Sequence, residues 1–536
     1  MRYSRLIAAS ALVFAFSLAK AQNYDPTVEV TKDFVSEMAD AQKLELKPTI
    51  PDSLTRFNLN FDYEVFNKPY KGSYNFTPYN VMLIPDDAGL KRPYLYLNAG
   101  AGYGLHPVLT AVVSPRLGRR FTLDLYQDLT GYSGAYERYS GYDLTETAGI
   151  RGSLRQDSFD FLFDLHYNGI AVRDTVLTGG MFHRFGGSVR LSSSDMAANW
   201  MSYDVMASYN VSRELAGPSP LTENEFLLYG TLAPSLQYEN LQFLLGFNTG
   251  YRGYFGAMDA ALYSIDTNPV FRFDVWKLHF SVGAILSYLS SADSYAMHIY
   301  PDVRMDLRLF NDRLDVFAGV KGGDRLNSYS SLKAANHHFN TGYAAAGQEQ
   351  ILSCTREFYD VFAGLGGSIG SLFQYNVVAG HSKIGSDTLL AADRWGNASL
   401  VLGNYSMDYI DASTTVATNP VDFSLGLHFK QTDIDKALAL TLPVLSSDAS
   451  LVWNWHRRFF AGVSFEMATA RASDVYTIDP FYNLGLSFEM KTSDWLSVWL
   501  RGDNLLNQRI ERIPGVVERG IGNGMYFSAG IRMDLR

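Results

Sequence analysis

The chain has 536 residues, one cysteine and a formal net charge of −10, and removal of residues 1–21 with their three cations changes that charge to −13. A single cysteine excludes an internal disulfide, and the acidic balance argues against a nucleic-acid-binding protein, so no nucleic-acid partner is expected. Aromatic residues make up 14% of the chain, a high share that suits the aromatic girdles at the two interfaces of a membrane protein.

Residues 1–21 have the pattern of a secretory signal peptide. Arg2 and Arg5 precede an apolar stretch of residues 6–18, and Ala19-Lys20-Ala21 supplies the small residues of a cleavage site. The alternative, an N-terminal membrane helix, needs about 20 apolar residues, and this stretch is shorter. We therefore predict export of the chain, cleavage after Ala21 and a mature protein that begins at Gln22.

Two segments precede the first predicted strand. Residues 22–56 carry mixed charges without periodicity, which predicts a periplasmic N-terminal extension. Residues 57–91 combine aromatic residues, among them Phe61, Tyr63 and Phe76, with turn formers, which predicts a packed lead-in without regular structure. We expect this lead-in to lie in the lumen, or at the periplasmic rim, of the barrel that the rest of the chain predicts.

From residue 92 to residue 536 the chain alternates between apolar and polar side chains in short segments. The clearest examples are residues 159–168 and residues 303–309. Because side chains on a strand alternate between two faces, each segment has one apolar and one polar face. The row Arg304, Asp306 and Arg308 is costly in a dry core and ordinary beside water, which favours a transmembrane barrel over a soluble sandwich.

The segments number about 22, although roughly 14 to 22 strands would fit this length. The first strands are expected near residues 94–103 and 108–113, with short turns at 155–158 and 311–313 and a long polar connection at 324–356. Bacterial barrels pair short periplasmic turns with longer external loops. The predicted fold class is all-β: a transmembrane antiparallel β-barrel in the outer membrane of a Gram-negative cell.

In such a barrel the polar face lines a wet interior and the apolar face meets lipid. The predicted lumen-lining side chains are Asp160, Asp164, His166, Arg304, Asp306, Arg308, His428, Lys430, Arg532 and Asp534.

The sequence carries no catalytic, phosphate-binding or zinc motif. The neighbouring residues His337 and His338 fall in the predicted long loop, where no carboxylate or cysteine stands nearby at ligand spacing, so we expect a solvated loop. We predict no enzyme activity, no catalytic residue, no metal site and no cofactor.

The C-terminus resembles that of the TonB-dependent receptor family. Residues 498–507 (Val-Trp-Leu-Arg-Gly-Asp-Asn-Leu-Leu-Asn) are similar to the family's penultimate strand and its Asn-Leu-Phe-Asn-like turn, and Pro514-Gly515 and three glycines of residues 522–530 follow in the expected order. The resemblance implies a barrel of 22 strands. It covers the barrel alone, because about 70 residues separate Gln22 from the first strand and the family's globular plug is longer.

Two functions remain open at this point. One is the passage of solutes across the outer membrane by a porin-like or partner-dependent transporter that resembles a plugless TonB-dependent receptor. The other is a non-conducting structural or assembly barrel that scaffolds an outer-membrane complex, with residues 22–54 as a docking segment. In both cases we expect contact with outer-membrane lipid and insertion by the barrel-assembly machinery, and a periplasmic or surface lipoprotein partner fits the second function.

Overall fold

The computed structural model describes residues 94–535, with gaps at 104–105, 116, 119, 137–138, 175–179, 195–200, 216–219, 235–240, 292–294, 311–312, 340–353, 396–397, 419 and 518–523. The predicted signal peptide, N-terminal extension and lead-in lie outside the described residues. Within the described part of the chain, no helix is long and apolar enough to cross a membrane.

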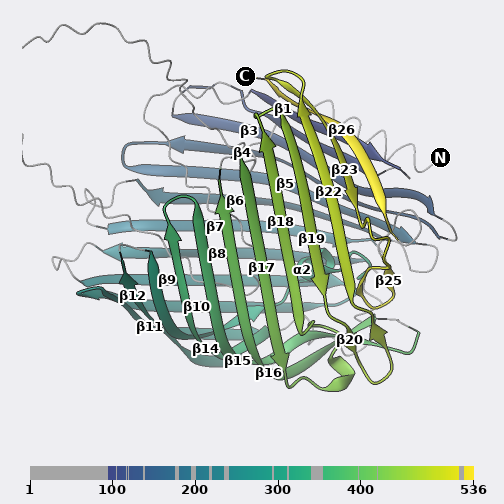
Figure 1. Cartoon of the computed structure of the whole chain (residues 1–536). Coiled ribbons are helices and arrows are strands. Elements are labelled where there is room, and N and C mark those ends of the chain that lie inside the picture. Colours follow the sequence, from purple (N-terminus) through teal and green to yellow (C-terminus); the bar gives the residue numbers. More distant parts are fainter. Residues whose placement is uncertain are drawn as a thin grey trace, which may run out of the picture. The chain divides into compact units, whose positions relative to one another are not determined.

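The described residues form one antiparallel sheet of 22 strands (Figure 1). Its strands are β1 (Leu95–Gly102), β2 (His106–Val113), β3 (Phe121–Tyr136), β4 (Tyr139–Arg155), β5 (Phe159–Asp174), β6 (Gly180–Ser193), β7 (Met201–Glu214), β8 (Leu221–Pro234), β9 (Leu241–Gly256), β10 (Ala260–Val275), β11 (Leu278–Ser291), β12 (Tyr295–Leu309), β13 (Leu314–Leu326), β14 (Cys354–Ile369), β15 (Phe373–Ala392), β16 (Ala398–Ala417), β17 (Val421–Thr432), β18 (Leu445–Trp455), β19 (Phe459–Ala468), β22 (Phe481–Lys491), β23 (Leu496–Asp503) and β26 (Tyr526–Leu535).

Each strand pairs with the next one along the sheet, and β1 pairs with both β2 and β26. The sheet is therefore closed. Closure removes every strand edge, so that backbone donors and acceptors are satisfied within the sheet, as a membrane-spanning β-structure requires. The predicted fold class, a 22-strand antiparallel barrel, is confirmed, and the first two strands begin within a few residues of the expected positions.

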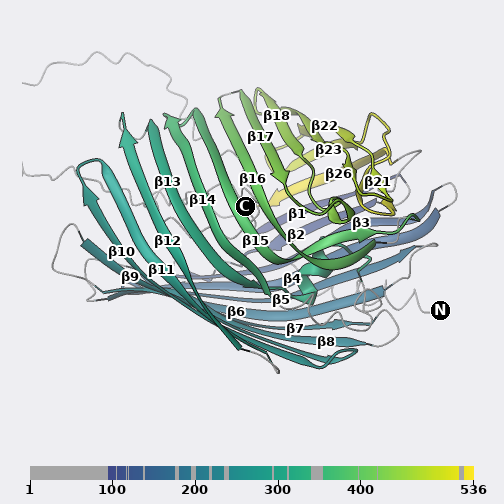
Figure 2. The same cartoon turned by 90° about the horizontal axis from the view of Figure 1, so that it is seen from below.

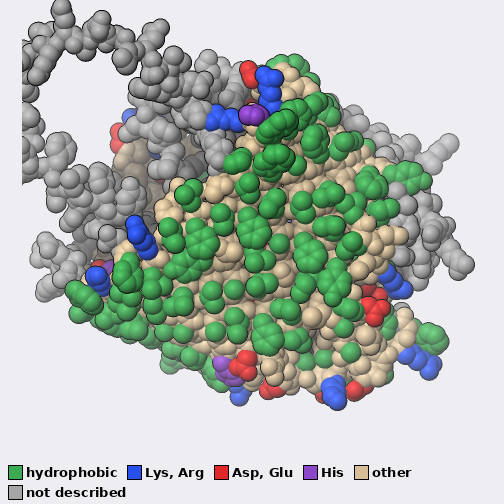
Figure 3. Space-filling view, viewed as in Figure 1, with side chains coloured by type: hydrophobic (Ala, Val, Ile, Leu, Met, Phe, Trp, Pro, Cys, Tyr) green, Lys and Arg blue, Asp and Glu red, His purple; other side chains and the backbone are tan. Residues whose placement is uncertain are grey.

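The outer face of the barrel is apolar. Leu165 and Phe185, on neighbouring strands β5 and β6, are 55% and 61% exposed. Apolar side chains cover the middle of the face shown in Figure 3, and charged side chains gather at its edges. An exposed apolar band with charged rims is the surface of a barrel that spans a membrane, and the protein is accordingly an outer-membrane barrel.

The long connections all lie at the end of the barrel opposite to the start of β1 and the end of β26. They follow β13, β17, β19 and β23 and contain α2 (Tyr329–Ala335), η3 (Lys436–Leu438), the pair β20 (Arg471–Ala472) and β21 (Thr477–Ile478), and the pair β24 (Glu511–Ile513) and β25 (Val516–Val517). The predicted long connection at 324–356 is observed between Leu326 and Cys354. Its helix α2 lies between the barrel walls formed by β5–β8 and β13–β16 (Figure 2).

Candidate functional site

The cross-strand pairings carry one polar face around the whole barrel. Asp164 on β5 lies opposite Arg151 on β4 and Ser188 on β6, and paired residues share a face. When these pairings are followed from strand to strand around all 22 strands, they lead back to the even-numbered residues of β5, so one face is continuous around the barrel. All ten side chains predicted from the sequence, on β5, β12, β17 and β26, fall on this face, which is opposite to the exposed apolar face.

Asp164 is the most heavily bonded of the ten. It is 7% exposed and accepts hydrogen bonds from Arg151 Nε (2.9 Å) and Tyr126 Oη (3.1 Å), while His166 Nδ1 lies 2.9 Å from it. Asp160, nearer the turn, pairs with Arg155 at 3.3 Å in an exposed position. Asp164 therefore ties three neighbouring strands together, and its charge is largely occupied by the wall itself.

Four more of the ten also have partners on the wall. Arg304 and Asp306 form an ion pair at 2.7 Å, and the Arg304 guanidinium lies 4.6 Å from the centre of the Phe317 ring. His428 contacts Asp411 at 2.6 Å, and Arg532 pairs with Glu489.

The last three of the ten differ in their surroundings. Asp534, opposite Tyr96 on β1, is also in contact with neighbouring groups. Arg308 and Lys430 make no side-chain ion pair with any of the described residues. Their charges are therefore the least neutralised of the ten.

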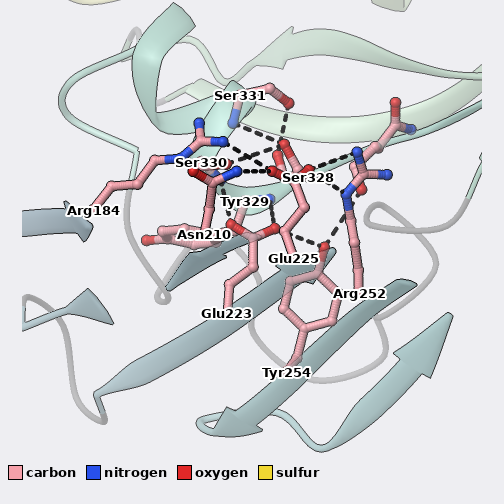
Figure 4. Close-up of polar contacts among 11 residues, drawn as sticks. Arg184, Asn210, Glu223, Glu225, Arg252, Tyr254, Ser328, Tyr329, Ser330 and Ser331 are labelled. Carbon is pink, nitrogen blue, oxygen red and sulfur yellow. Dashed lines mark hydrogen bonds and ion pairs between the residues drawn. The ribbon is translucent and has the colours of Figure 1, made fainter. Parts of the chain in front are cut away.

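A second polar cluster, which the sequence reading missed, surrounds the segment from Asn327 to Phe339, here called the α2 segment. Ser328 caps the helix, accepting a hydrogen bond from the Ser331 backbone N–H at 3.0 Å. Glu223 on β8 accepts from the backbone N–H groups of Tyr329 and Ser330, both at 3.0 Å, and from Tyr254 Oη at 3.1 Å (Figure 4). The barrel wall thus supplies the acceptor for the first-turn donors that a helix leaves unpaired.

A buried ion pair fixes the other end of the helix. Lys333 Nζ lies 2.9 Å from Glu214 Oε2 on β7, with side-chain exposures of 1% and 0%. Glu214 also accepts from Tyr329 Oη at 3.2 Å, and Lys333 donates to the Phe339 carbonyl at 2.7 Å. Burial lowers the pKa of the Lys333 ammonium, and the Glu214 carboxylate opposes that shift. Loss of either partner would leave a charge in a site that excludes water.

Glu225 forms a second layer behind Glu223. Arg184 and Arg252 converge on its carboxylate, at 2.8 Å each, and Asn210 donates to it at 3.2 Å (Figure 4). Two cations and one anion leave this layer with a positive excess, which offsets the neighbouring carboxylate of Glu223.

The α2 segment runs along the polar face from one part of the wall to a distant one. Asn327 Nδ2 donates to Thr355 on β14 at 3.1 Å, and His337 Nδ1 lies 2.8 Å from Asp143 on β4. Strands β4 and β14 are ten positions apart in a sheet of 22, close to the eleven that would place them opposite each other. The expectation of a solvated loop at His337 and His338 is wrong, because His338 is only 6% exposed and His337 is bonded to the wall.

The described residues contain no group of three or more His, Cys, Asp or Glu side chains that could share a metal ion. The arrangement consists of ion pairs and hydrogen bonds along a polar wall.

Comparison with known proteins agrees with the barrel class. No family model and no curated protein matches the sequence. Among solved structures, the FrpB iron transporter from Neisseria meningitidis matches at a TM-score of 0.64 and 11% identity, over 83% of this chain and 81% of that one. The copper transporter OprC matches at 0.61 and 12%, over 82% and 80% of the two chains.

The ferripyoverdine receptor of the outer membrane of Pseudomonas aeruginosa matches at a TM-score of 0.64 and 10% identity, over 82% of this chain and 72% of that one. The matched 82–83% of 536 residues is about 440, the length of the described barrel. The chain therefore has the 22-strand barrel fold of the TonB-dependent receptors, and the resemblance predicted from the C-terminus is confirmed at the level of the fold.

Proposed function

We propose that the protein passes solutes across the outer membrane through the barrel interior, as a porin-like or partner-dependent transporter resembling a plugless TonB-dependent receptor. The observation that supports this function is the polar face that continues around all 22 strands. An eight-stranded barrel is filled by its own side chains, whereas barrels of this strand number enclose a channel or a plugged lumen.

The dimensions support a lumen that the described residues leave partly unfilled. Strands about 4.8 Å apart and tilted by about 40° give a barrel of 22 strands a backbone radius of roughly 22 Å. A helix with its side chains is about 10–12 Å across, so α2 narrows such a lumen without filling it. The remaining space is open to water, or another element occupies it.

Within this function the ten predicted side chains line the lumen in two roles. Asp164 bonds to Arg151 on β4 and Tyr126 on β3 and so ties neighbouring strands together, whereas Arg304 and Asp306 neutralise each other within β12. Arg308 and Lys430 present charge to the solute. The aromatic lead-in at residues 57–91 is our candidate for the element that occupies part of the lumen, because exposed aromatic residues in a soluble segment would present apolar surface to water.

Planar-bilayer conductance of the purified mature chain tests this function, with a variant that lacks residues 22–90 measured beside it. A transporter with a lead-in in its lumen predicts small or gated currents for the mature chain and a large, stable conductance for the deletion variant. Equal currents from the two proteins would place the lead-in outside the lumen.

The alternative is a non-conducting scaffold for an outer-membrane complex. The compact arrangement of the loops that contain β20–β21 and β24–β25 favours it, because ordered loops present a fixed surface to a partner. Absence of conductance from both proteins, together with stoichiometric co-purification of a lipoprotein, would establish the scaffold and reject the transporter.

A further inference from the structure

A pocket of about 260 Å³ lies at the long-loop end of the barrel, between the wall formed by β17–β22 and the loops above it. Its lining includes Asp448, Glu466, Met467, Arg471, Phe481 and Arg512. The pocket is separate from the α2 segment, whose hydrogen bonds and ion pairs to the wall are with β4, β7–β9, β14 and β15. Nothing in the solute-passage proposal assigns it a role.

Arg471 forms one side of the pocket and is 8% exposed. Its Nη atoms donate to the carbonyl oxygens of Leu440 (3.1 Å), Glu511 (3.3 Å) and Arg512 (2.8 Å), and its Nε has no hydrogen-bond partner among the described residues. These acceptors are neutral carbonyl groups, and no carboxylate of the described residues forms an ion pair with this guanidinium. A buried cation that meets only backbone carbonyls keeps a strong attraction for an anion.

The other guanidinium in the pocket is already neutralised. Arg512 makes a bidentate ion pair with Glu466, and it lies 4.9 Å from the centre of the Phe481 ring. Bidentate pairing of this kind satisfies both charges. Arg512 and Glu466 therefore form part of the pocket wall as a mutually neutralised ion pair.

Asp448 is the carboxylate left over. Its nearest charged partner is His428 Nε2 at 3.6 Å, and that imidazole is bonded more closely, at 2.6 Å, to Asp411. The Asp448 side chain is 66% exposed, so it is free to meet a ligand from solution. The pocket thus presents one cation and one anion that are not paired with each other.

We propose that this pocket binds a small zwitterion, such as a free amino acid or the end of a short peptide. The ligand's carboxylate lies toward Arg471, its ammonium lies toward Asp448, and its apolar side chain packs against Phe481 and Met467. A singly charged ligand would leave one of the two protein charges without a partner, and a neutral ligand would leave both.

The size of the pocket agrees with this class of ligand. At about 30 Å³ per water molecule, 260 Å³ holds between eight and nine water-sized positions. Leucine has about nine non-hydrogen atoms and an apolar side chain, which makes it the natural probe. The proposal concerns binding alone and does not require the barrel to conduct.

The test is equilibrium dialysis of radiolabelled leucine against the full mature protein in detergent, with N-acetylleucine and leucine methyl ester as analogues. The acetyl group removes the ammonium and the ester removes the carboxylate, so both analogues are expected to bind at least about tenfold more weakly than leucine. The ester is used instead of an Arg471 variant, because replacing Arg471 would also remove its hydrogen bonds to the loop carbonyls of Leu440, Glu511 and Arg512.

Asp448→Asn is the matched variant, because an exposed side chain can change without loss of the fold. It should weaken leucine binding by about tenfold and leave the weak binding of N-acetylleucine unchanged. The control is Asp422→Asn. Asp422 lies on β17, on the same face of the sheet as Asp448 but outside the pocket, so this variant should bind leucine like the wild type. Equal affinity for leucine and N-acetylleucine, an unchanged Asp448→Asn protein, or no leucine binding at all would overturn the proposal.

Discussion

Substitution of Leu427 by arginine tests the assignment of the two faces most directly. Leu427 lies on the apolar face of β17 and is 40% exposed. Leu427 is six residues from Val421, where the strand starts. At about 3.4 Å per residue and a tilt of about 40°, this separation corresponds to roughly 16 Å along the membrane normal, within a hydrophobic band about 25 Å tall. Arginine at this depth costs about 2–4 kcal/mol, which lowers the folding equilibrium constant by a factor of roughly 30 to 1,000.

Ser424→Arg is the matched control. Ser424 lies on the opposite face of the same strand, where its hydroxyl contacts Ser450 at 2.7 Å, so arginine at this position should stay hydrated in the interior. Both variants would be unfolded by urea in lipid vesicles, with tryptophan fluorescence and heat-modifiable migration as readouts. If the two arginines reduce stability equally, or Ser424→Arg reduces it more, the faces have been assigned incorrectly.

Three further predictions concern other parts of the chain. Lys333→Met leaves the buried Glu214 carboxylate without its cation and should destabilise the α2 segment by about 3–5 kcal/mol. Faster hydrogen exchange of α2, with unchanged migration of the barrel on gels, would report this loss. The double variant Lys333→Met/Glu214→Leu should recover the slow hydrogen exchange of the α2 segment. Gly530→Val places a side chain against the ring of Trp499, and should lower the urea midpoint by an amount equivalent to about 1–3 kcal/mol at the closing strands. N-terminal sequencing of the outer-membrane fraction should begin at Gln22, and retention of Met1 would contradict export by cleavage.

The sequence predicts the strands well because lipid and water impose a period of two on each of them. In β5 the apolar residues Phe161, Phe163 and Leu165 alternate with Asp160, Leu162 and Asp164, and the structure places the two sets on opposite faces. No long-range information is needed for this assignment, since each strand meets the same two solvents. The number of strands follows from repeating the assignment along the chain.

The α2 segment could not be predicted in the same way. Glu214 and Glu223 have the pattern of ordinary polar-face residues, yet their partners Tyr329 and Ser330 are 115 and 107 residues away. His337 meets a carboxylate that is 194 residues distant. A loop that folds back over the polar face depends on complementary side chains on strands far apart in sequence. The alternation of residues within one strand cannot predict such long-range contacts.

Strand alternation also fails where the strands carry bulges. One extra residue in β14 near Phe358, and one in β15 near Ser386, whose φ is 53°, shift the register beside the start of the α2 segment. A bulge reverses the faces of all residues beyond it, because the side-chain period is two. If the alternation of residues 373–384 continued through β15, Asp387 would face lipid. In the structure Asp387 faces the interior, where it accepts a hydrogen bond from Thr355 Oγ1 at 3.2 Å, and Thr355 is also bonded to Asn327. The same two bulges that defeat the sequence pattern therefore bring the wall into contact with the first residue of the α2 segment.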